Sequence, residues 1–207
     1  MKQNKINKKF VYLISPNKIS NINFYDDLAL VLSSKKISFF QLRLKKETNS
    51  NKLIIGKKIK KICNKYKVKF LINDDPLLAK KLNADGCHLG QKDMDLIKAR
   101  KILKNKIIGV TCHNSINLAK RAIEAGADYL AFGAFYATKT KTVKYRASLT
   151  VLKSIKKITS VPIVAIGGIK LNNYKKLLLN KANFLAISGY IWNNKKYKPL
   201  EAIKKLK

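Results

Sequence analysis

Two aspartates, Asp74 and Asp93, are the residues whose type and spacing best fit a chemical role. Each comes after a short apolar run, Lys69–Ile72 before Asp74 and Cys87–Leu89 before Asp93. A segment of helical length, Pro76–Leu82, separates the two runs, so the pattern predicts a strand, a helix and a second, parallel strand. Both aspartates would then lie past the carboxyl ends of the strands, where α/β proteins place their active sites.

Acidic residues are rare in this chain and concentrate around these two positions. The sequence has 11 Asp and Glu against 45 Lys and Arg, and five of the 11 fall in one short stretch: Asp74, Asp75, Asp85, Asp93 and Asp95. Oxygen ligands are what hard cations bind, so we predict that Asp74 and Asp93 hold Mg²⁺. Asp75 and Asp95 are interpreted instead as N-caps of the helices that follow them.

Length and composition predict a single domain over residues 1–207 with a sizeable core, since 46% of the residues are hydrophobic. No apolar run is long enough to span a membrane. The basic N-terminus leads after only a few apolar residues to Pro16, which favours a cytoplasmic enzyme over a secreted one. The three cysteines, Cys63, Cys87 and Cys112, show no metal-binding spacing and are expected to be buried free thiols.

The formal charge of +34 would usually suggest a nucleic acid or an anionic membrane as partner. However, only four of the 45 basic residues are arginine, whereas readers of bases and phosphates favour arginine forks. Lys, Asn and Ile share A- and T-rich codons, so a biased genome accounts for the charge. We therefore expect no nucleic acid and no membrane partner, although the basic field would attract phosphate-rich substrates.

Alternating apolar patterns predict eight strands and eight helices in strict succession. The strands are Val11–Ser15, Phe39–Leu44, Lys69–Ile72, Cys87–Leu89, Ile107–Thr111, Tyr129–Phe132, Pro162–Ile166 and Phe184–Ile187. The helices are Asp26–Ser34, Leu53–Tyr66, Pro76–Leu82, Asp95–Leu103, Ser115–Ala125, Leu149–Ile158, Tyr174–Leu179 and Leu200–Leu206. A similar phrase, NADGCHLG, GADYLAFG or KANFLAIS, occurs at the fourth, sixth and eighth strands. Such regular units predict a single (β/α)₈ TIM barrel, an α/β fold.

The second strand carries a polar face made of Gln41, Arg43 and Lys45, which alternate with apolar residues. In a barrel strand the apolar residues would contact the helices, and the polar ones would point inward. Two cations inside a barrel are costly unless they bind an anion. The alternative, an edge strand with one solvated face, is disfavoured because a closed barrel has no edges.

Three loops at the carboxyl ends of later strands could bind phosphate. The loop after the sixth strand offers hydroxyls and ammonium groups from Thr138 to Lys141. Paired glycines, Gly167-Gly168, follow the seventh strand, where barrel phosphate sites recur, although one of them could serve only a left-handed turn. Ile187-Ser188-Gly189 after the eighth strand would complete the cup.

The two histidines lack partners at metal-ligand spacing. His88 lies within the fourth predicted strand and is interpreted as an interior histidine whose hydrogen bonds are satisfied. His113 lies just past the fifth strand, near the expected site, and receives no role.

These motifs together resemble thiamine-phosphate synthase. The matching pieces are QLRLK (41–45), INDDPLLAKKLNADGCHLGQKD (72–93), IGVTCH (108–113), AGADYLAFGAFYATKTK (125–141), VAIGGI (164–169) and FLAISG (184–189). They occur in the family's order and spacing over most of the chain. The resemblance implies a (β/α)₈ barrel that joins hydroxymethylpyrimidine diphosphate to a thiazole phosphate, or to its carboxylated tautomer, and releases pyrophosphate.

The resemblance also implies roles for individual residues. Mg²⁺ would be bound by Asp74 and Asp93. The pyrimidine diphosphate would be bound by the segment Gln41, Leu42, Arg43, Leu44 and Lys45 together with Asn73 and Thr111. The thiazole phosphate would be bound by Thr138, Lys139, Thr140, Gly168, Ile187 and Ser188, and the pyrophosphate by Lys141. Arg43, Lys45 and Lys141 would be the catalytic cations.

Three departures from the family pattern accompany this assignment. Thr111 stands where the family usually has Ser and keeps the hydroxyl, and Lys139 interrupts a loop that commonly reads Thr-Pro-Thr. The segment SGYIW (188–192) differs from the usual run of small residues after the eighth strand.

Two alternative functions remain at the level of sequence. A thiazole tautomerase-like barrel would need a proton-moving residue such as His113 but not the diphosphate and metal set, so the presence of Arg43, Lys45, Asp74 and Asp93 argues against it. A basic nucleic-acid-binding protein is the alternative from another class. The sequence leaves open whether the chain forms a homo-oligomer.

Overall fold

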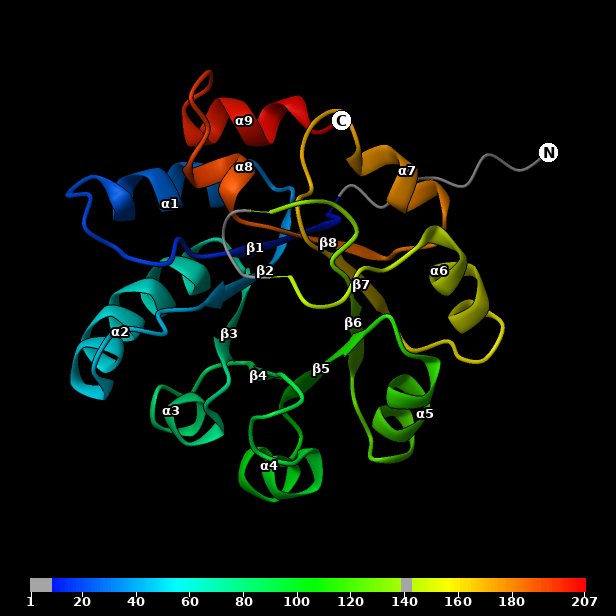
Figure 1. Cartoon of the computed structure of the whole chain (residues 1–207). Coiled ribbons are helices and arrows are strands. Elements are labelled where there is room, and N and C mark those ends of the chain that lie inside the picture. Colours follow the sequence, from blue (N-terminus) through cyan, green and yellow to red (C-terminus); the bar gives the residue numbers. More distant parts are fainter. Residues whose placement is uncertain (1–8, 139–142) are drawn as a thin grey trace.

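The structure, a computed structural model, describes residues 9–138 and 143–207. Eight parallel strands hydrogen-bond to one another in chain order, and β8 pairs with β1 to close a barrel. Figure 1 looks into this barrel, with the strands around the centre and the helices outside them. The predicted (β/α)₈ TIM barrel is confirmed. That the whole chain forms one catalytic domain stays a prediction.

The strands are β1 (Val11–Ile14), β2 (Ile37–Leu42), β3 (Lys69–Asn73), β4 (Gly86–Leu89), β5 (Ile107–His113), β6 (Tyr129–Phe132), β7 (Ile163–Ile166) and β8 (Phe184–Ile187). The helices are α1 (Phe24–Ser33), α2 (Asn49–Lys65), α3 (Pro76–Lys81), α4 (Leu96–Leu103), α5 (Ile116–Glu124), α6 (Leu149–Lys156), α7 (Tyr174–Leu179), α8 (Gly189–Trp192) and α9 (Pro199–Lys205).

Helix starts follow the capping residues. Asp75 and Asp95 accept hydrogen bonds from the first-turn N–H groups of α3 and α4, which confirms these two predicted caps, and Ser115 caps α5 in the same way. Thr48 caps α2 in the same way, so this helix begins four residues before the predicted Leu53. Apolar spacing alone could not locate that start, because the first turn of α2 is polar.

Two other differences concern the strands nearest the site. β2 ends at Leu42, two residues before the predicted end, and β5 continues to His113 instead of stopping at Thr111. The short helix α8, which no periodic pattern announces, follows β8 directly.

The core has two layers, as the barrel architecture requires. The outer layer lies between strands and helices and includes Phe40, Leu42 and Leu44, so the predicted apolar face of the second strand is confirmed. The inner layer fills the barrel with side chains that alternate with these: Tyr12, Leu71, Tyr129, Ala131, Val164 and Ala186, with Phe39 packed against them. The barrel interior is therefore a packed core and not a pore.

The repeated sequence phrase has a structural explanation at the opposite end of the barrel. In each copy an Asp or Asn just before the even-numbered strand accepts a hydrogen bond from a backbone N–H of the preceding odd-numbered strand. These bonds join Asp85 to Phe70 (2.9 Å), Asp128 to Ile108 (2.7 Å) and Asn183 to Ile163 (2.9 Å). The repeat thus fastens the amino-terminal rim and serves stability rather than chemistry.

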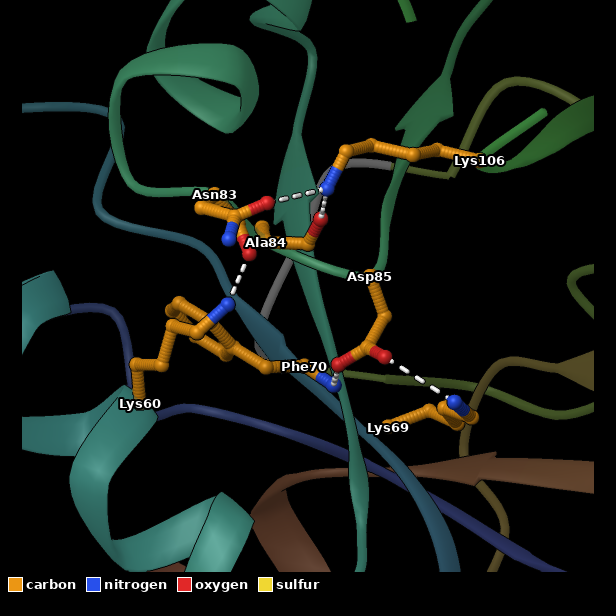
Figure 2. A network of polar contacts seen from close by, with 7 residues as sticks. All are labelled: Lys60, Lys69, Phe70, Asn83, Ala84, Asp85 and Lys106. Carbon is orange, nitrogen blue, oxygen red and sulfur yellow. Dashed lines mark hydrogen bonds and ion pairs between the residues drawn. The ribbon is translucent and has the colours of Figure 1, made fainter. Parts of the chain in front are cut away.

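Figure 2 shows this rim at Asp85, whose carboxylate also pairs with Lys69 at 3.0 Å. Lys106 donates to the side-chain oxygen of Asn83 (2.7 Å) and to the carbonyl of Ala84 (2.6 Å), while Lys60 bonds the Asn83 carbonyl. Part of the large basic charge is therefore used to hold loop carbonyls at the rim.

The three cysteines are buried and free, as predicted. No helix in residues 9–138 or 143–207 is both long and apolar enough to cross a membrane.

Candidate active site

Asp74 lies at the centre of a charged cluster at the carboxyl end of β3. Its backbone adopts a left-handed conformation (φ 66°), and its N–H donates to the carbonyl of His88 on β4 at 2.8 Å. One carboxylate oxygen of Asp74 is 2.8 Å from Nζ of Lys45. A left-handed aspartate is uncommon and costs free energy, and such strain concentrates at functional sites.

Asp93 reaches the same point from the loop after β4. Its side chain accepts a hydrogen bond from the N–H of Gly90 at 2.6 Å, and it lies within hydrogen-bonding reach of the Asp74 carboxylate. A side chain at position 90 would crowd this carboxylate, since a Cβ there would be 2.9 Å from Asp93 Oδ2. The structure therefore brings the two predicted metal ligands together.

The two carboxylates shift each other's pKa in opposite directions. Burial raises the pKa of Asp93, and its contact with Asp74 raises it further. Burial would also raise the pKa of Asp74, but its bonds to Asp93 and to Lys45 outweigh burial and lower it. On acidification, Asp93 is the member of the pair that takes up a proton first.

This arrangement predicts opposite stability effects for Asn substitutions in metal-free protein at pH 7. Because the pKa of Asp93 is raised in the folded protein, the protein loses folding stability as pH rises through the titration range of this carboxyl group. Asp93→Asn is therefore expected to raise the melting temperature. The pKa of Asp74 is lowered in the folded protein, so ionised Asp74 contributes folding stability above the usual carboxyl range, and this stability is lost as pH falls. Asp74→Asn is therefore expected to lower the melting temperature by about 2–4 °C. Thermal denaturation in EDTA measures both; equal shifts of the same sign would contradict the prediction.

Two further predicted site residues come from β2 and the segment after it: Gln41 lies in β2, and Arg43 follows its last residue. Arg43 donates from Nη1 to Asn17 Oδ1 at 2.9 Å, and its backbone N–H donates to the hydroxyl of Ser15 at 2.9 Å. Burial lowers the pKa of the Arg43 guanidinium, while the nearby charge of Asp74 raises it. Its side chain is therefore held close to Asp74 by partners on the β1 loop.

Gln41 points into the barrel and is 2% exposed, as the alternation predicted. Its amide nitrogen is buried without a hydrogen-bond partner among the described residues. A buried amide donor left without an acceptor is costly, so a ligand atom that accepts from it would contribute to binding.

Lys45 differs from its predicted placement. It lies beyond the end of β2, its side chain is 51% exposed, and it pairs with Asp74 instead of pointing into the barrel. The earlier end of β2 is the reason, because residues past the strand no longer follow its alternation. Leu42 and Leu44 have buried side chains in the layer between strands and helices, and both residues also line the pocket beside this cluster.

A pocket of about 250 Å³ adjoins this cluster and is lined in part by Lys45, Asn73 and Asp74. Its apolar wall includes Leu42 and Ile72, which belong to the layer between strands and helices. The pocket therefore lies beside the barrel mouth, on the side of α3.

Thr111 and Asn73 complete the predicted pyrimidine side. Asn73 ends β3 and is paired in register with His88. Thr111 on β5 is 8% exposed; its hydroxyl bonds Nε2 of His88 at 2.8 Å, and its carbonyl accepts from the side chain of Gln91 at 2.6 Å. His88 is thus a satisfied interior histidine, as predicted.

On the thiazole side, the structure describes Thr138 but not the predicted site residues that follow it. Lys139, Thr140 and Lys141 lie outside the described residues. The first part of the loop follows the end of β7, since Tyr136 donates its N–H to the carbonyl of Gly167 at 3.2 Å.

Gly167 and Gly168 both have positive φ, 99° and 61°. A Cβ at Gly168 would lie 2.3 Å from the carbonyl oxygen of Ala137, so the glycine also lets the β6 loop approach. The chain at Ala137, directly before Thr138, therefore lies against the glycine turn.

The eighth-strand loop is anchored to β1. The hydroxyl of Ser188 donates to the carbonyl of Ser15 at 3.0 Å, and the indole N–H of Trp192 donates to the carbonyl of Ile14 at 2.7 Å. Ile187 has a side chain buried in the outer core layer, so only its backbone could face a ligand. The unusual SGYIW segment is thus a helix, α8, that Trp192 fixes to the end of β1.

Sequence reasoning missed several residues that position the site. Ser15 supports Arg43, Asn17 bonds its guanidinium, and Gln91 bonds the backbone of Thr111. Tyr145 stacks on His113 with ring centroids 4.3 Å apart, which ties the loop after β6 to β5. These residues carry no periodic or motif signal; a polar residue at a strand end, such as Ser15, is the one hint the sequence offers.

Known proteins similar to this chain identify its family. A family model described as thiamine monophosphate synthase matches residues 11–191. A thiamine-phosphate synthase from Pelagibacter ubique (strain HTCC1062) is 95% identical over 207 residues, 100% of both chains. One from Nitrosomonas eutropha is 38% identical over 184 residues, 88% of this chain and 86% of the relative.

Among solved structures, a thiamine phosphate pyrophosphorylase from Pyrococcus furiosus superposes with a TM-score of 0.82 at 26% identity, covering 97% of this chain and 94% of that one. A 3-hexulose-6-phosphate synthase, at 17% identity and a TM-score of 0.66, shares the fold alone. The sequence matches extend over nearly every element that builds the site, from β1 to α8. This chain belongs to the thiamine monophosphate synthase family.

Proposed function

We propose that this protein joins hydroxymethylpyrimidine diphosphate to a thiazole phosphate, or to its carboxylated tautomer, and releases pyrophosphate in thiamine biosynthesis. The observation that carries the proposal is its 95% identity, over the full length of both chains, with a thiamine-phosphate synthase. The meeting of Arg43, Lys45, Asp74 and Asp93 at the barrel mouth supports it, because a departing diphosphate needs such charges.

The donor set at the barrel mouth fits Mg²⁺. Among the described residues no group of three or more His, Cys, Asp or Glu could hold a metal, so Asp74 and Asp93 would need further oxygen ligands. Mg²⁺ typically takes one or two carboxylates and completes its shell with substrate phosphates and water. We therefore propose that Asp74 and Asp93 hold the ion together with the diphosphate.

In this reaction the bond between the pyrimidine methylene carbon and the diphosphate oxygen breaks, and pyrophosphate leaves with the bonding electrons. The amino group of the pyrimidine supplies electrons to the resulting cation, and the thiazole nitrogen then forms a bond to the methylene carbon. Mg²⁺ would neutralise charge on the leaving group. Arg43, Lys45 and Lys141 would stabilise the same charge, and the barrel mouth would position the two substrates.

The remaining site residues divide between the two substrates. Gln41, Asn73 and Thr111 would bind the pyrimidine, with the backbone of Leu42 and Leu44 beside them. The thiazole phosphate would be bound by Thr138, Lys139, Thr140, Gly168, Ile187 and Ser188. We further propose that the protein acts in the cytoplasm on these small phosphates, without nucleic acid or membrane.

Pyrophosphate release tests the function. With purified protein, both substrates and Mg²⁺, release is expected at a rate proportional to enzyme, with thiamine phosphate formed in equal amount. Omitting either substrate or adding excess EDTA should abolish it. Pyrophosphate formed from the pyrimidine diphosphate alone would indicate a hydrolase, and retention on DNA without turnover would favour the nucleic-acid-binding alternative.

A further inference from the structure

A chain of hydrogen bonds crosses the inside of the barrel and ends at the active site. The hydroxyls of Tyr12 on β1 and Tyr129 on β6 are 2.8 Å apart, and the Tyr129 hydroxyl is 2.9 Å from Nδ1 of His88. Nε2 of His88 is 2.8 Å from the hydroxyl of Thr111. Tyr12 is 2% and Tyr129 is 3% exposed, so both tyrosine hydroxyls are shielded from water, whereas His88 is partly exposed.

The barrel interior is shaped to hold these rings. The His88 and Tyr129 rings are stacked, with centroids 5.7 Å apart and planes at 14°. Gly109, two residues before Thr111 on β5, leaves space for the tyrosine, since a Cβ there would lie 1.8 Å from the Tyr129 ring. Burial raises the pKa of both tyrosines, so both hydroxyls keep their protons.

The need to pair buried donors determines which group donates in each bond of this hydrogen-bond chain. In the described part of the protein, the Tyr12 hydroxyl bonds only Tyr129, so its proton must be donated to the Tyr129 oxygen. Tyr129 must then donate its own proton to Nδ1 of His88. A proton on Nδ1, in the neutral or the cationic imidazole, would make Tyr129 accept from His88 and would leave one of the two tyrosine hydroxyl protons buried and unpaired.

The direction continues to Thr111. With Nδ1 accepting, the ring proton of neutral His88 is on Nε2, and this N–H donates to the Thr111 hydroxyl oxygen. The structure gives that hydroxyl no second bond among the described residues. Its own proton is therefore left for an acceptor other than His88.

We propose that Tyr129 and His88 are positioning residues that make the Thr111 hydroxyl a hydrogen-bond donor to an acceptor atom of the bound pyrimidine diphosphate. The role assigned to Thr111 rests on the proposed function, whereas the direction of the chain rests on the geometry alone. A donor fixed in advance costs no reorientation when charge develops on the substrate.

The tautomer of His88 tests the direction independently of activity. The chain has only two histidines, so protein labelled with ¹⁵N-histidine gives two imidazole spin systems in long-range ¹H–¹⁵N spectra, and His113→Gln identifies that of His88. At pH 7 we expect Nε2 protonated and Nδ1 bare. A proton on Nδ1, alone or together with one on Nε2, would overturn the proposal even in a fully active enzyme.

Kinetics of matched tyrosine variants test the consequence. Tyr129→Phe removes the donor to His88 and is expected to lower kcat about tenfold, with the KM for the thiazole phosphate unchanged. Tyr12→Phe removes the same kind of buried hydroxyl but leaves the bond from Tyr129 to His88, so kcat should stay within about twofold of wild type. Equal losses in the two variants would show a merely structural role and overturn the proposal.

A double-mutant comparison locates the effect at Thr111. Thr111→Val keeps the shape and removes the hydroxyl, so adding Tyr129→Phe to it should cause no further loss of kcat. A further tenfold loss would contradict the proposal. If Tyr129→Phe does not fold because Tyr12 is left unpaired, the pair Tyr12→Phe/Tyr129→Phe, compared with Tyr12→Phe, gives the same measurement with no orphaned hydroxyl.

Discussion

Replacing Asp74 or Asp93 with Asn is expected to lower the turnover number about 100-fold, which is the usual cost of removing one charge-stabilising group from an active site. Asn keeps the size and one oxygen of the side chain but not its charge, so the change affects electrostatics more than packing. Each variant should need more Mg²⁺ for half-maximal pyrophosphate release. Binding of the thiazole phosphate alone should stay near wild type, because its predicted contacts lie on β6, β7 and β8.

Asp75→Asn and Asp95→Asn are the matched controls for this experiment. Both carboxylates accept from first-turn N–H groups of α3 and α4, and Asn caps a helix about as well as Asp does. These two variants should therefore keep nearly full activity. If all four variants lose activity alike, or if the wild-type protein turns over in excess EDTA, the metal assignment is wrong.

The barrel could be predicted because its signals are local and repeated. The third and fourth strands end in a clear change from apolar to polar residues, and the NADG, GADY and KANF phrases mark the fourth, sixth and eighth strands. The structure gives these phrases a different meaning from the motifs at the other end of the strands. Asp85, Asp128 and Asn183 hold the amino-terminal rim, far from the loops that carry Asp74 and Asp93.

The sequence indicates which residues meet at the site but not which contacts they make with one another. We expected Asp74 and Asp93 at one edge of the sheet, but no sequence pattern indicates that Lys45 pairs with Asp74 instead of pointing inward. That pair forms because β2 ends at Leu42 and Asp74 adopts a left-handed backbone, and both depend on neighbouring strands. The hydrogen bonds that join Tyr12 to Tyr129, Tyr129 to His88 and His88 to Thr111 likewise span 117, 41 and 23 positions of the sequence, so no local pattern reveals them.

The second large effect concerns Arg43 and Lys45, the cations that we propose face the diphosphate. Arg43→Ala and Lys45→Ala are each expected to lower turnover about 100-fold while the protein stays folded. The fold should survive the loss of Lys45, because its pair with Asp74 is half exposed, and exposed pairs contribute only about 0–1 kcal/mol. Steady-state pyrophosphate release and thermal denaturation, measured on the same preparations, check both parts of this prediction.

Lys46→Ala distinguishes a specific contact from the general field of a protein with a formal charge of +34. Lys46 is exposed and next to Lys45, so its substitution removes the same charge from almost the same place. If the basic field alone attracts the substrate, both lysine variants should lower kcat/KM equally, and the loss should shrink at high salt. A direct contact between Lys45 and the leaving diphosphate predicts instead that kcat falls only in Lys45→Ala, and that this loss persists when the field is screened.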